Sequence, residues 1–349
     1  MQQSTYLIGE IGQNHNGSVE IAKLIVDVAA RSVIDPLFNH ELKGMDAIKL
    51  TKRDLDYELS ASALKKPYDS PHSFGKTYGE HRKAVELGEE QHFEIYKYAK
   101  EKGLDVIETL CAVPCLSILK YFTPDKLKVA SRDLTNLPLL ESLSETRIPM
   151  IISTGMAGKE DLDQALSVIT KYHNQISILH CVSEYPANPV HVNLNSIPYL
   201  KKHYPEFTIG YSDHTIGIST PVAAVAMGAA IIEKHLTIDR KMKGTDQAGS
   251  LGIEGVQRMV RDIRLLELSF GKNKIFMEPA VAEGKIKLER SIATNRAFKS
   301  GEVLTQKDLH LLSPGDGFKW NEREKILGKK IKIDIGKNEI IYLDFLQDI

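Results

Sequence analysis

Eight short apolar segments, each typical of a β-strand, recur along the first part of the chain with helix-like segments between them. Most are β-branched or Leu-rich runs without clean alternation, as in strands that are covered on both faces. Alternating strands and helices indicate a parallel α/β fold, and eight such units by about residue 270 predict a closed TIM (β/α)8 barrel. The expected strands are residues 6–10, 46–51, 105–109, 126–130, 149–153, 176–180, 207–211 and 229–233. Helical periods include residues 19–30, 90–102, 159–172, 220–227 and 254–270.

The pattern changes after Gly271, which predicts a barrel domain over residues 1–271, a linker over 272–287 and a small, mostly β domain over 288–349. A domain of that size buries little surface alone, so we expect it to dock on another surface. Two segments interrupt the barrel pattern. Residues 34–44 lengthen one turn, and residues 52–88 form a long polar excursion that is equally typical of a functional loop and of a solvated one.

Charge and composition exclude several classes of protein. The formal net charge of −1 gives no broad attraction to nucleic acid or to a membrane surface, so neither partner is expected. The first residues run straight into an apolar strand without a basic region, so we expect no secretory signal, and no apolar run approaches the ~20 residues of a membrane span. The cysteines are odd in number and sparse, which favours buried, reduced thiols and a cytoplasmic location. They are Cys111, Cys115 and Cys181.

Two histidines lie one barrel repeat apart, in the segments GYSDHTIGIS and IIEKHLTID. Strands of a TIM barrel deliver their C-terminal residues to one face, where the active site is found. His214 and His235 should therefore converge there, with Asp213 and Glu233 nearby. Imidazoles and carboxylates suit a divalent transition metal. The alternative is that they are two unrelated loop histidines.

Two lysines, Lys49 and Lys128, lie in or at the ends of apolar strands. A buried lysine without a partner is costly, and an anionic ligand in a shared cleft would remove that cost. Strand-end hydroxyl groups could complete a phosphate or carboxylate cradle, or could instead satisfy backbone groups or cap helices. They belong to Thr109, Ser131, Ser153, Thr154, Ser183 and Ser212.

The motifs GEIGQNHNGS, KVASRDLTN, STGM, GYSDHT and IEKHLTID together resemble the sialic acid synthase (N-acetylneuraminate synthase) family. The segment ERSIATNRAFKSGEVLTQKDL is similar to the antifreeze-like (SAF) domain that follows its barrel. This resemblance implies an enzyme that condenses phosphoenolpyruvate with an N-acetylmannosamine-type sugar aldehyde, giving a nonulosonic acid and phosphate. It also implies a domain-swapped homodimer, in which the SAF domain of one subunit covers the barrel mouth of the other.

Residue roles follow from the resemblance. It implies that His214 and His235 bind a divalent metal, most often Mn²⁺, with Mg²⁺ or Co²⁺ as alternatives. Glu10 matches a carboxylate near the reacting centre, and Glu233 lies on or near the sugar side. The expected catalytic residues are Glu10, Lys49, Lys128 and Asp133. The expected substrate-binding residues are Thr109, Ser131, Arg132, Ser153, Ser183, Tyr185, Ser212 and Asp246.

Departures from the family pattern concern the sugar side and put the acceptor in doubt. Arg132, Lys52 and Arg53 could bind a phosphate or other acidic group, so we expect an acceptor other than plain N-acetylmannosamine. Alternatively, Arg132 simply pairs with Asp133 or a nearby Glu. The departures are Asp133 for Glu, Arg132 for Gly, Thr51 for Gln, Ser313 for Arg and Ser183 for Asn.

Three other functions fit parts of the pattern. One is a synthase that makes a different 3-deoxy-2-keto acid from phosphoenolpyruvate and another aldose. The second is a metal-dependent barrel hydrolase, which would not need Lys49 and Lys128. The third is a non-enzymatic binding protein, which the intact set of two lysines and two histidines argues against.

Overall fold

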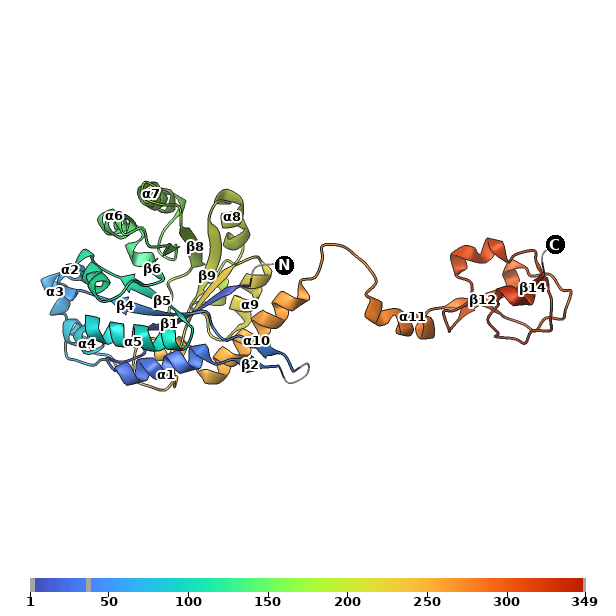
Figure 1. The fold of residues 1–349 in the computed structure, drawn as a ribbon, viewed down its shortest axis with the longest axis horizontal. Coiled ribbons are helices and arrows are strands. Elements are labelled where there is room, and N and C mark those ends of the chain that lie inside the picture. Colours follow the sequence, from blue (N-terminus) through green and yellow to red (C-terminus); the bar gives the residue numbers. More distant parts are fainter. Residues whose placement is uncertain (1–3, 36–38, 348–349) are drawn as a thin grey trace. The chain divides into compact units, whose positions relative to one another are not determined.

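The structure is a computed structural model that describes residues 4–35 and 39–347. It divides into two compact units between Gly271 and Lys272. The first unit is a closed barrel of parallel strands in the order β1-β10-β9-β8-β7-β6-β5-β4, so the predicted barrel is confirmed (Figure 1). The strands are β1 (Tyr6–Gly12), β4 (Ala47–Lys52), β5 (Asp105–Leu110), β6 (Lys126–Val129), β7 (Met150–Ser153), β8 (Ile176–Cys181), β9 (Thr208–Asp213) and β10 (Ile231–His235).

Helices surround the strands on the outside of the barrel (Figure 1). They are α1 (Val19–Ala30), α5 (Glu89–Glu101), α6 (Leu137–Glu145), α7 (Lys159–Ile169), α8 (Ser196–His203), α9 (Ser219–Ala226) and α10 (Ile253–Ser269), with the 3₁₀ helix η1 (Val113–Lys120) after β5. The start of α1 illustrates how the local sequence sets a helix boundary. The Ser18 side chain accepts a hydrogen bond from the Ile21 amide and so satisfies one free backbone donor of the first turn. Among the described residues, no helix has both the length and the apolar character needed to cross a membrane.

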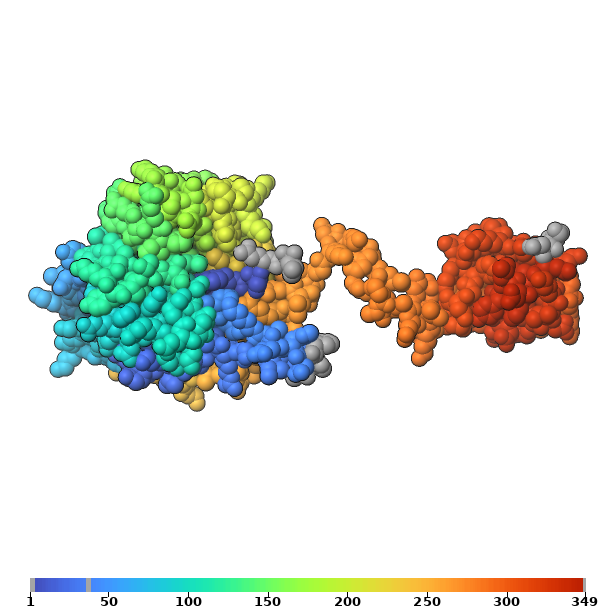
Figure 2. Space-filling model, viewed as in Figure 1, coloured from blue at the N-terminus to red at the C-terminus, as the bar shows by residue number. Residues whose placement is uncertain are grey.

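The excursion after β4 is more ordered than the sequence indicates. It contains three short helices, α2 (Leu55–Glu58), α3 (Ala61–Leu64) and α4 (Tyr78–Ala84). They pack on one another and form a continuous part of the barrel's outer surface, at the left of Figure 2. The lengthened turn over 34–44 holds a small hairpin of β2 (Val33–Ile34) and β3 (Glu41–Leu42), with residues 36–38 outside the described part.

The barrel interior begins with a closed apolar layer. Its side chains come from six different strands and are fully or almost fully buried. Because successive side chains of a strand point to opposite faces, the residue two positions further on points into the barrel again. This register sets which residues form the floor of the cavity above the layer. The layer consists of Ile8, Ala47, Ile107, Ile151, Leu179 and Ile231.

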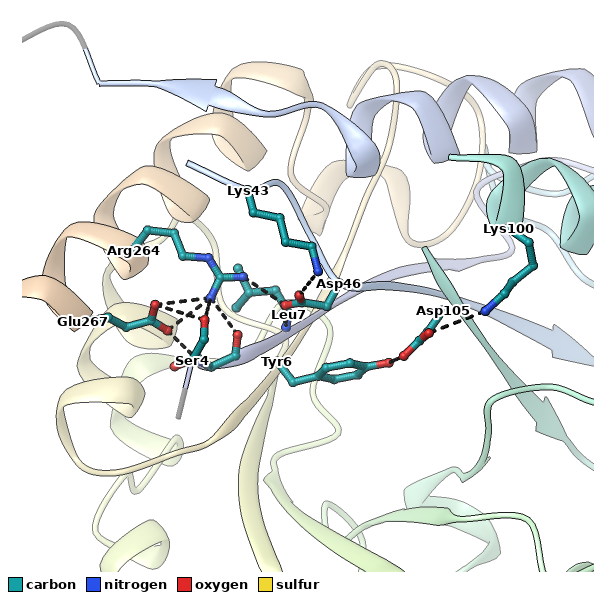
Figure 3. A network of polar contacts seen from close by, with 10 residues as sticks. Ser4, Tyr6, Leu7, Lys43, Asp46, Lys100, Asp105, Arg264 and Glu267 are labelled. Atoms are coloured by element: carbon teal, nitrogen blue, oxygen red, sulfur yellow. Dashed lines mark hydrogen bonds and ion pairs between the residues drawn. The ribbon is translucent and has the colours of Figure 1, made fainter. Parts of the chain in front are cut away.

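A polar network closes the opposite, N-terminal end of the barrel (Figure 3). Arg264 of α10 pairs with Asp46 just before β4 (Nη2–Oδ2 2.9 Å) and with Glu267 (Nη1–Oε1 3.2 Å). The Asp46 carboxylate also accepts from the Leu7 amide at 2.9 Å. A buried guanidinium is tolerated when it is paired in this way. The network therefore joins the last helix to the first two barrel strands, at the face where stability rather than catalysis is expected.

The second unit is small and mostly β, as predicted. It contains two antiparallel two-stranded sheets with a separate apolar core that includes Ile292, Phe298 and Ile331. The expected linker over 272–287 is not wholly irregular, because the helix α11 (Ala282–Leu288) begins inside it. The strands are β11 (Ser291–Thr294), β12 (Leu309–Leu312), β13 (Lys330–Ile331) and β14 (Leu346–Gln347).

Candidate active site

A pocket of about 270 Å³ opens at the C-terminal ends of the barrel strands. The strand register explains which residues form the floor of this pocket. Glu10, Lys49 and Thr109 each lie two residues beyond a member of the apolar layer, so their side chains point into the barrel above it. Of the expected catalytic, metal-binding and substrate-binding residues, Asp133 is not among the lining residues. Lys52, Thr154 and Asp213, which the sequence also suggests, do not line the pocket either, and the Asp213 carboxylate pairs instead with Lys234. Those that line the pocket are Glu10, Lys49, Thr109, Lys128, Ser131, Arg132, Ser153, Ser183, Tyr185, Ser212, His214, Glu233, His235 and Asp246.

Buried charges of both signs meet on this floor. The Lys49 ammonium lies 2.7 Å from Glu10 Oε2 and 3.4 Å from Glu233 Oε1. Burial raises the pKa of Glu10 to about 7, despite the opposing charge of Lys49. Burial also acts to raise the pKa of Glu233, but the charges of Lys128 and Lys49 outweigh it and hold that pKa at about 2. Glu233 is therefore the fixed anion of the floor.

Lys128 differs from Lys49 in its partners. It is 2% exposed, and its ammonium donates to the Val129 carbonyl oxygen at 3.1 Å. Within the described residues no carboxylate forms an ion pair with it, and burial lowers its pKa. The charge of Glu233 acts on Lys128 without a direct ion pair, and a buried ammonium of this kind that lines a pocket is suited to bind an anion.

A small cradle of polar atoms surrounds Gly155, just beyond β7. A Cβ atom at this position would lie 2.5 Å from Ser183 Oγ and 2.8 Å from both Ser131 Oγ and Cys181 Sγ. The Gly155 amide donates to Ser131 Oγ at 3.0 Å. Glycine thus leaves room for a ligand atom among hydroxyl donors, whereas any side chain would fill the space.

The two histidines converge, as the sequence predicts. Their ring centroids lie 5.4 Å apart, and the Tyr185 ring packs against both. His214 Nδ1 lies 3.0 Å from the Val182 carbonyl oxygen, a contact that places the proton on Nδ1 and leaves Nε2 as an acceptor. His235 Nδ1 is buried without a hydrogen-bond partner, 4.0 Å from Asp246 Oδ2.

These atoms fit a divalent ion of the open, catalytic kind. Gly12, at φ +53°, lets the chain turn so that the Glu10 carboxylate comes close to the His235 ring; a Cβ there would lie 2.8 Å from Glu10 Oε1 and 3.6 Å from His235 Cε1. In the part of the chain that the structure describes, no three His, Cys, Asp or Glu side chains form a complete ligand cluster. Two imidazoles would leave the remaining positions to water or substrate.

Several lining residues were not predicted. All three cysteines are free and buried, as expected, but Cys111 and Cys181 also line the pocket. Cys181 lies two positions after Leu179, so the strand register could have identified it. Gln13, Arg82 and Met156 come from turns and from α4, for which the sequence holds no comparable signal.

Comparison with known proteins agrees with this geometry. Residues 40–275 match the NeuB family, and residues 289–347 match the SAF domain. The chain belongs to the NeuB family. The predicted resemblance and the order of the two domains in the chain are thereby confirmed, and the protein is an enzyme of this family.

NeuB-family relatives cover almost the whole chain. Human N-acetylneuraminate-9-phosphate synthase is 32% identical over 97% of this chain and 92% of the relative. N,N'-diacetyllegionaminic acid synthase of Legionella pneumophila is 31% identical over 98% of this chain and 94% of the relative. A solved sialic acid synthetase from Leptospira borgpetersenii, in complex with citrate, aligns with a TM-score of 0.65 at 31% identity, over 81% of this chain and 90% of that one.

Proposed function

We propose that this enzyme condenses phosphoenolpyruvate with an aldose to give a nonulosonic 3-deoxy-2-keto acid and inorganic phosphate, with a divalent metal at His214 and His235. The observation that carries the proposal is the buried Lys128 ammonium, which forms no direct ion pair with a carboxylate of residues 4–35 or 39–347 and lies on the floor of a pocket that also holds two converging imidazoles. A hydrolase would need the imidazoles but not this cation.

The anion of phosphoenolpyruvate fits the floor of the pocket. Lys128 would contribute the charge, and the Gly155 cradle would contribute the hydroxyl groups of Ser131 and Ser183. Charge-assisted hydrogen bonds of this kind are shorter and stronger than neutral ones. Lys49 is already neutralised by Glu10 and Glu233, so it would mainly position the carboxylates and stabilise charge that develops during the reaction.

His214 and His235 would hold the metal, most consistently Mn²⁺, with Mg²⁺ or Co²⁺ as alternatives. A divalent ion at this place supplies Lewis acidity that polarises the aldehyde of the acceptor. The contact of His214 with the Val182 carbonyl fixes the ring so that Nε2 faces away from that carbonyl. The tyrosine ring of Tyr185 limits the motion of both imidazoles.

The reaction balances with water as the third reactant. C3 of phosphoenolpyruvate forms a bond to the aldehyde carbon, whose oxygen takes a proton. Water adds to C2 and gives up one proton; the C2–O bond to phosphate then breaks while the new C2 hydroxyl passes its remaining proton to the departing phosphate and becomes the keto oxygen. Glu10, beside Lys49 and the His235 ring, is placed to accept the proton of the attacking water.

The test is release of phosphate and loss of phosphoenolpyruvate when the enzyme, Mn²⁺ and phosphoenolpyruvate are mixed with a panel of aldoses. We expect turnover only when an aldose is present. Consumption of phosphoenolpyruvate with aldoses unrelated to N-acetylmannosamine would instead favour a synthase for a different 3-deoxy-2-keto acid. Absence of turnover with every aldose would contradict the proposal.

A further inference from the structure

We propose that the acceptor aldose carries a phosphate group at the end distant from its aldehyde, and that Arg82 at the pocket mouth binds this phosphate. The inference rests on the proposed function and names the substrate class of the same site. It assigns a role to the excursion over residues 52–88, which supplies the arginine.

Arg82 is held firmly in place. It lies on α4, which begins with a capping box in which the Thr77 hydroxyl accepts from the Glu80 amide and the Glu80 carboxylate accepts from the Thr77 amide. His81, the residue before Arg82, packs its ring against the ring of Tyr68, with centroids 4.7 Å apart. His81 Nδ1 also accepts a hydrogen bond from the Phe74 amide at 3.2 Å. The capping box at its start and the contacts of His81 thus anchor α4, a helix of only two turns. The orientation of the Arg82 side chain is therefore set before any ligand binds.

The Arg82 guanidinium is buried, and among the described residues Glu86 acts on it only at a distance, without a direct ion pair. The residue is 6% exposed, and Nη1 donates to Gln13 Oε1 at 2.9 Å. Nη2 is buried and has no hydrogen-bond partner, and within the described residues no carboxylate forms an ion pair with the group. Burial and the nearby charge of Arg53 lower its pKa. A guanidinium in this position gains most from a ligand that brings negative charge.

The two neighbouring arginines already have carboxylate partners. Arg53 Nη1 and Arg132 Nη2 share Glu58 Oε2, at 3.1 Å and 2.9 Å. Arg53 Nε also lies 3.4 Å from Glu86 Oε1, and Arg132 Nε lies 3.2 Å from Asp133 Oδ2. Arg132 therefore pairs with Asp133 and with a nearby Glu, as in the alternative interpretation of the sequence. The carboxylates beside this wall of the pocket, which Arg53, Arg82 and Arg132 form, are all paired with Arg53 or Arg132. They belong to Glu58, Glu86 and Asp133. Arg53 Nε has no hydrogen-bond partner either, but it faces the Glu86 carboxylate, whereas the unpartnered Nη2 of Arg82 belongs to a guanidinium that forms no ion pair within the described residues.

Position and charge together indicate the kind of ligand. The floor and the imidazole pair would hold phosphoenolpyruvate and the aldehyde, whereas Arg82 comes from a helix outside the strand ends and lines the same pocket. A group that reaches it belongs to the far end of the acceptor. Arg53, Arg82 and Arg132 all line this wall, and several guanidinium groups suit a dianionic phosphate better than a single carboxylate.

The test compares three acceptors on the full-length enzyme with Mn²⁺, by loss of phosphoenolpyruvate: N-acetylmannosamine, its 6-phosphate and the corresponding 6-uronate. We expect kcat/KM to be at least ~10-fold higher for the phosphate than for either of the others, since one charged hydrogen bond is worth about that factor. An equal or better result with the uncharged sugar, or with the uronate, overturns the inference but leaves the proposed function standing. No turnover with any aldose instead overturns the proposed function.

A variant then locates the phosphate contact. Arg82→Met should lower the ratio of kcat/KM for the phosphorylated over the plain sugar by about 10- to 100-fold, and Arg82→Lys should restore part of it. Lys83→Met is the matched control, because Lys83 lies on the same helix, is exposed and is not among the residues that line the pocket, so the ratio should stay unchanged. KM for phosphoenolpyruvate reports on folding. An unchanged ratio in an Arg82→Met enzyme with normal phosphoenolpyruvate KM overturns the inference, and if that variant does not fold, the acceptor comparison decides.

Discussion

The Lys49 ammonium lies 2.7 Å from Glu10 Oε2, and both side chains are buried beneath the pocket. Lys128, two strands away, has no such partner among the described residues and donates only to a backbone carbonyl. The two lysines that the sequence suggests as a pair therefore have different environments. A cation that is already neutralised binds an added anion weakly, so we expect the anion of the substrate to contact Lys128 rather than Lys49.

Lys128→Met should weaken phosphoenolpyruvate binding by about 10- to 100-fold, because a charge-assisted contact worth ~1.5–3 kcal/mol is lost. Sugar binding should change far less. Lys126→Met is the matched control, since Lys126 belongs to the same strand but lies over the Tyr6 ring, 4.9 Å from its centroid. Calorimetry measures both affinities. An unchanged phosphoenolpyruvate affinity in the Lys128 variant would contradict the assignment.

Replacing His214 or His235 by Ala should remove bound Mn²⁺ and activity while the fold survives, because each change takes away one of the two proposed imidazole ligands that line the pocket. Metal content after dialysis, activity and a thermal melt measure the three effects. His191→Ala controls for loss of a histidine as such, since that side chain is 58% exposed and pairs with Glu184. Full activity of a His235→Ala enzyme in the presence of a chelator would disprove the metal role.

Arg264→Met should destabilise the barrel by about 3–5 kcal/mol, because it leaves Asp46 and Glu267 without their shared buried partner. Arg258→Met, on the same helix, removes an exposed pair with Glu254 and should cost no more than ~0.5 kcal/mol. Urea unfolding gives both values. The Arg264 network lies at the end of the barrel opposite the pocket. KM for phosphoenolpyruvate should therefore stay unchanged in both variants. A large change in this KM would show that the two ends of the barrel are coupled.

The fold could be predicted from the sequence because every barrel strand must be apolar on both faces. That requirement leaves a recognisable apolar run even in a strand as short as β7, whose sequence is MIIS. The floor could be predicted for a related reason, since a charged residue such as Lys49 or Glu233 two positions after a buried aliphatic one points into the barrel.

The wall of the pocket that Arg53, Arg82 and Arg132 form could not be predicted in the same way. Arg82 lies on a helix of seven residues, whose place depends on a capping box and on the packing of His81 rather than on any long apolar pattern. Asp133, chosen by resemblance, lies on a short 3₁₀ turn where its carboxylate binds Arg132 instead of facing the pocket. Short polar segments are positioned by tertiary contacts, and local sequence patterns do not predict those contacts.

The assembly is the last prediction. The unit after Gly271 has a core of its own, but it is small, and units of this size gain stability by docking. The resemblance implies that the docking surface is the barrel mouth of a second subunit, so we expect a symmetric homodimer. Light scattering coupled to size exclusion, at micromolar concentrations, should give twice the chain mass of 39.0 kDa. A mass that stays at one chain across that range would contradict the prediction, and the pocket would then have to work without a contribution from a partner.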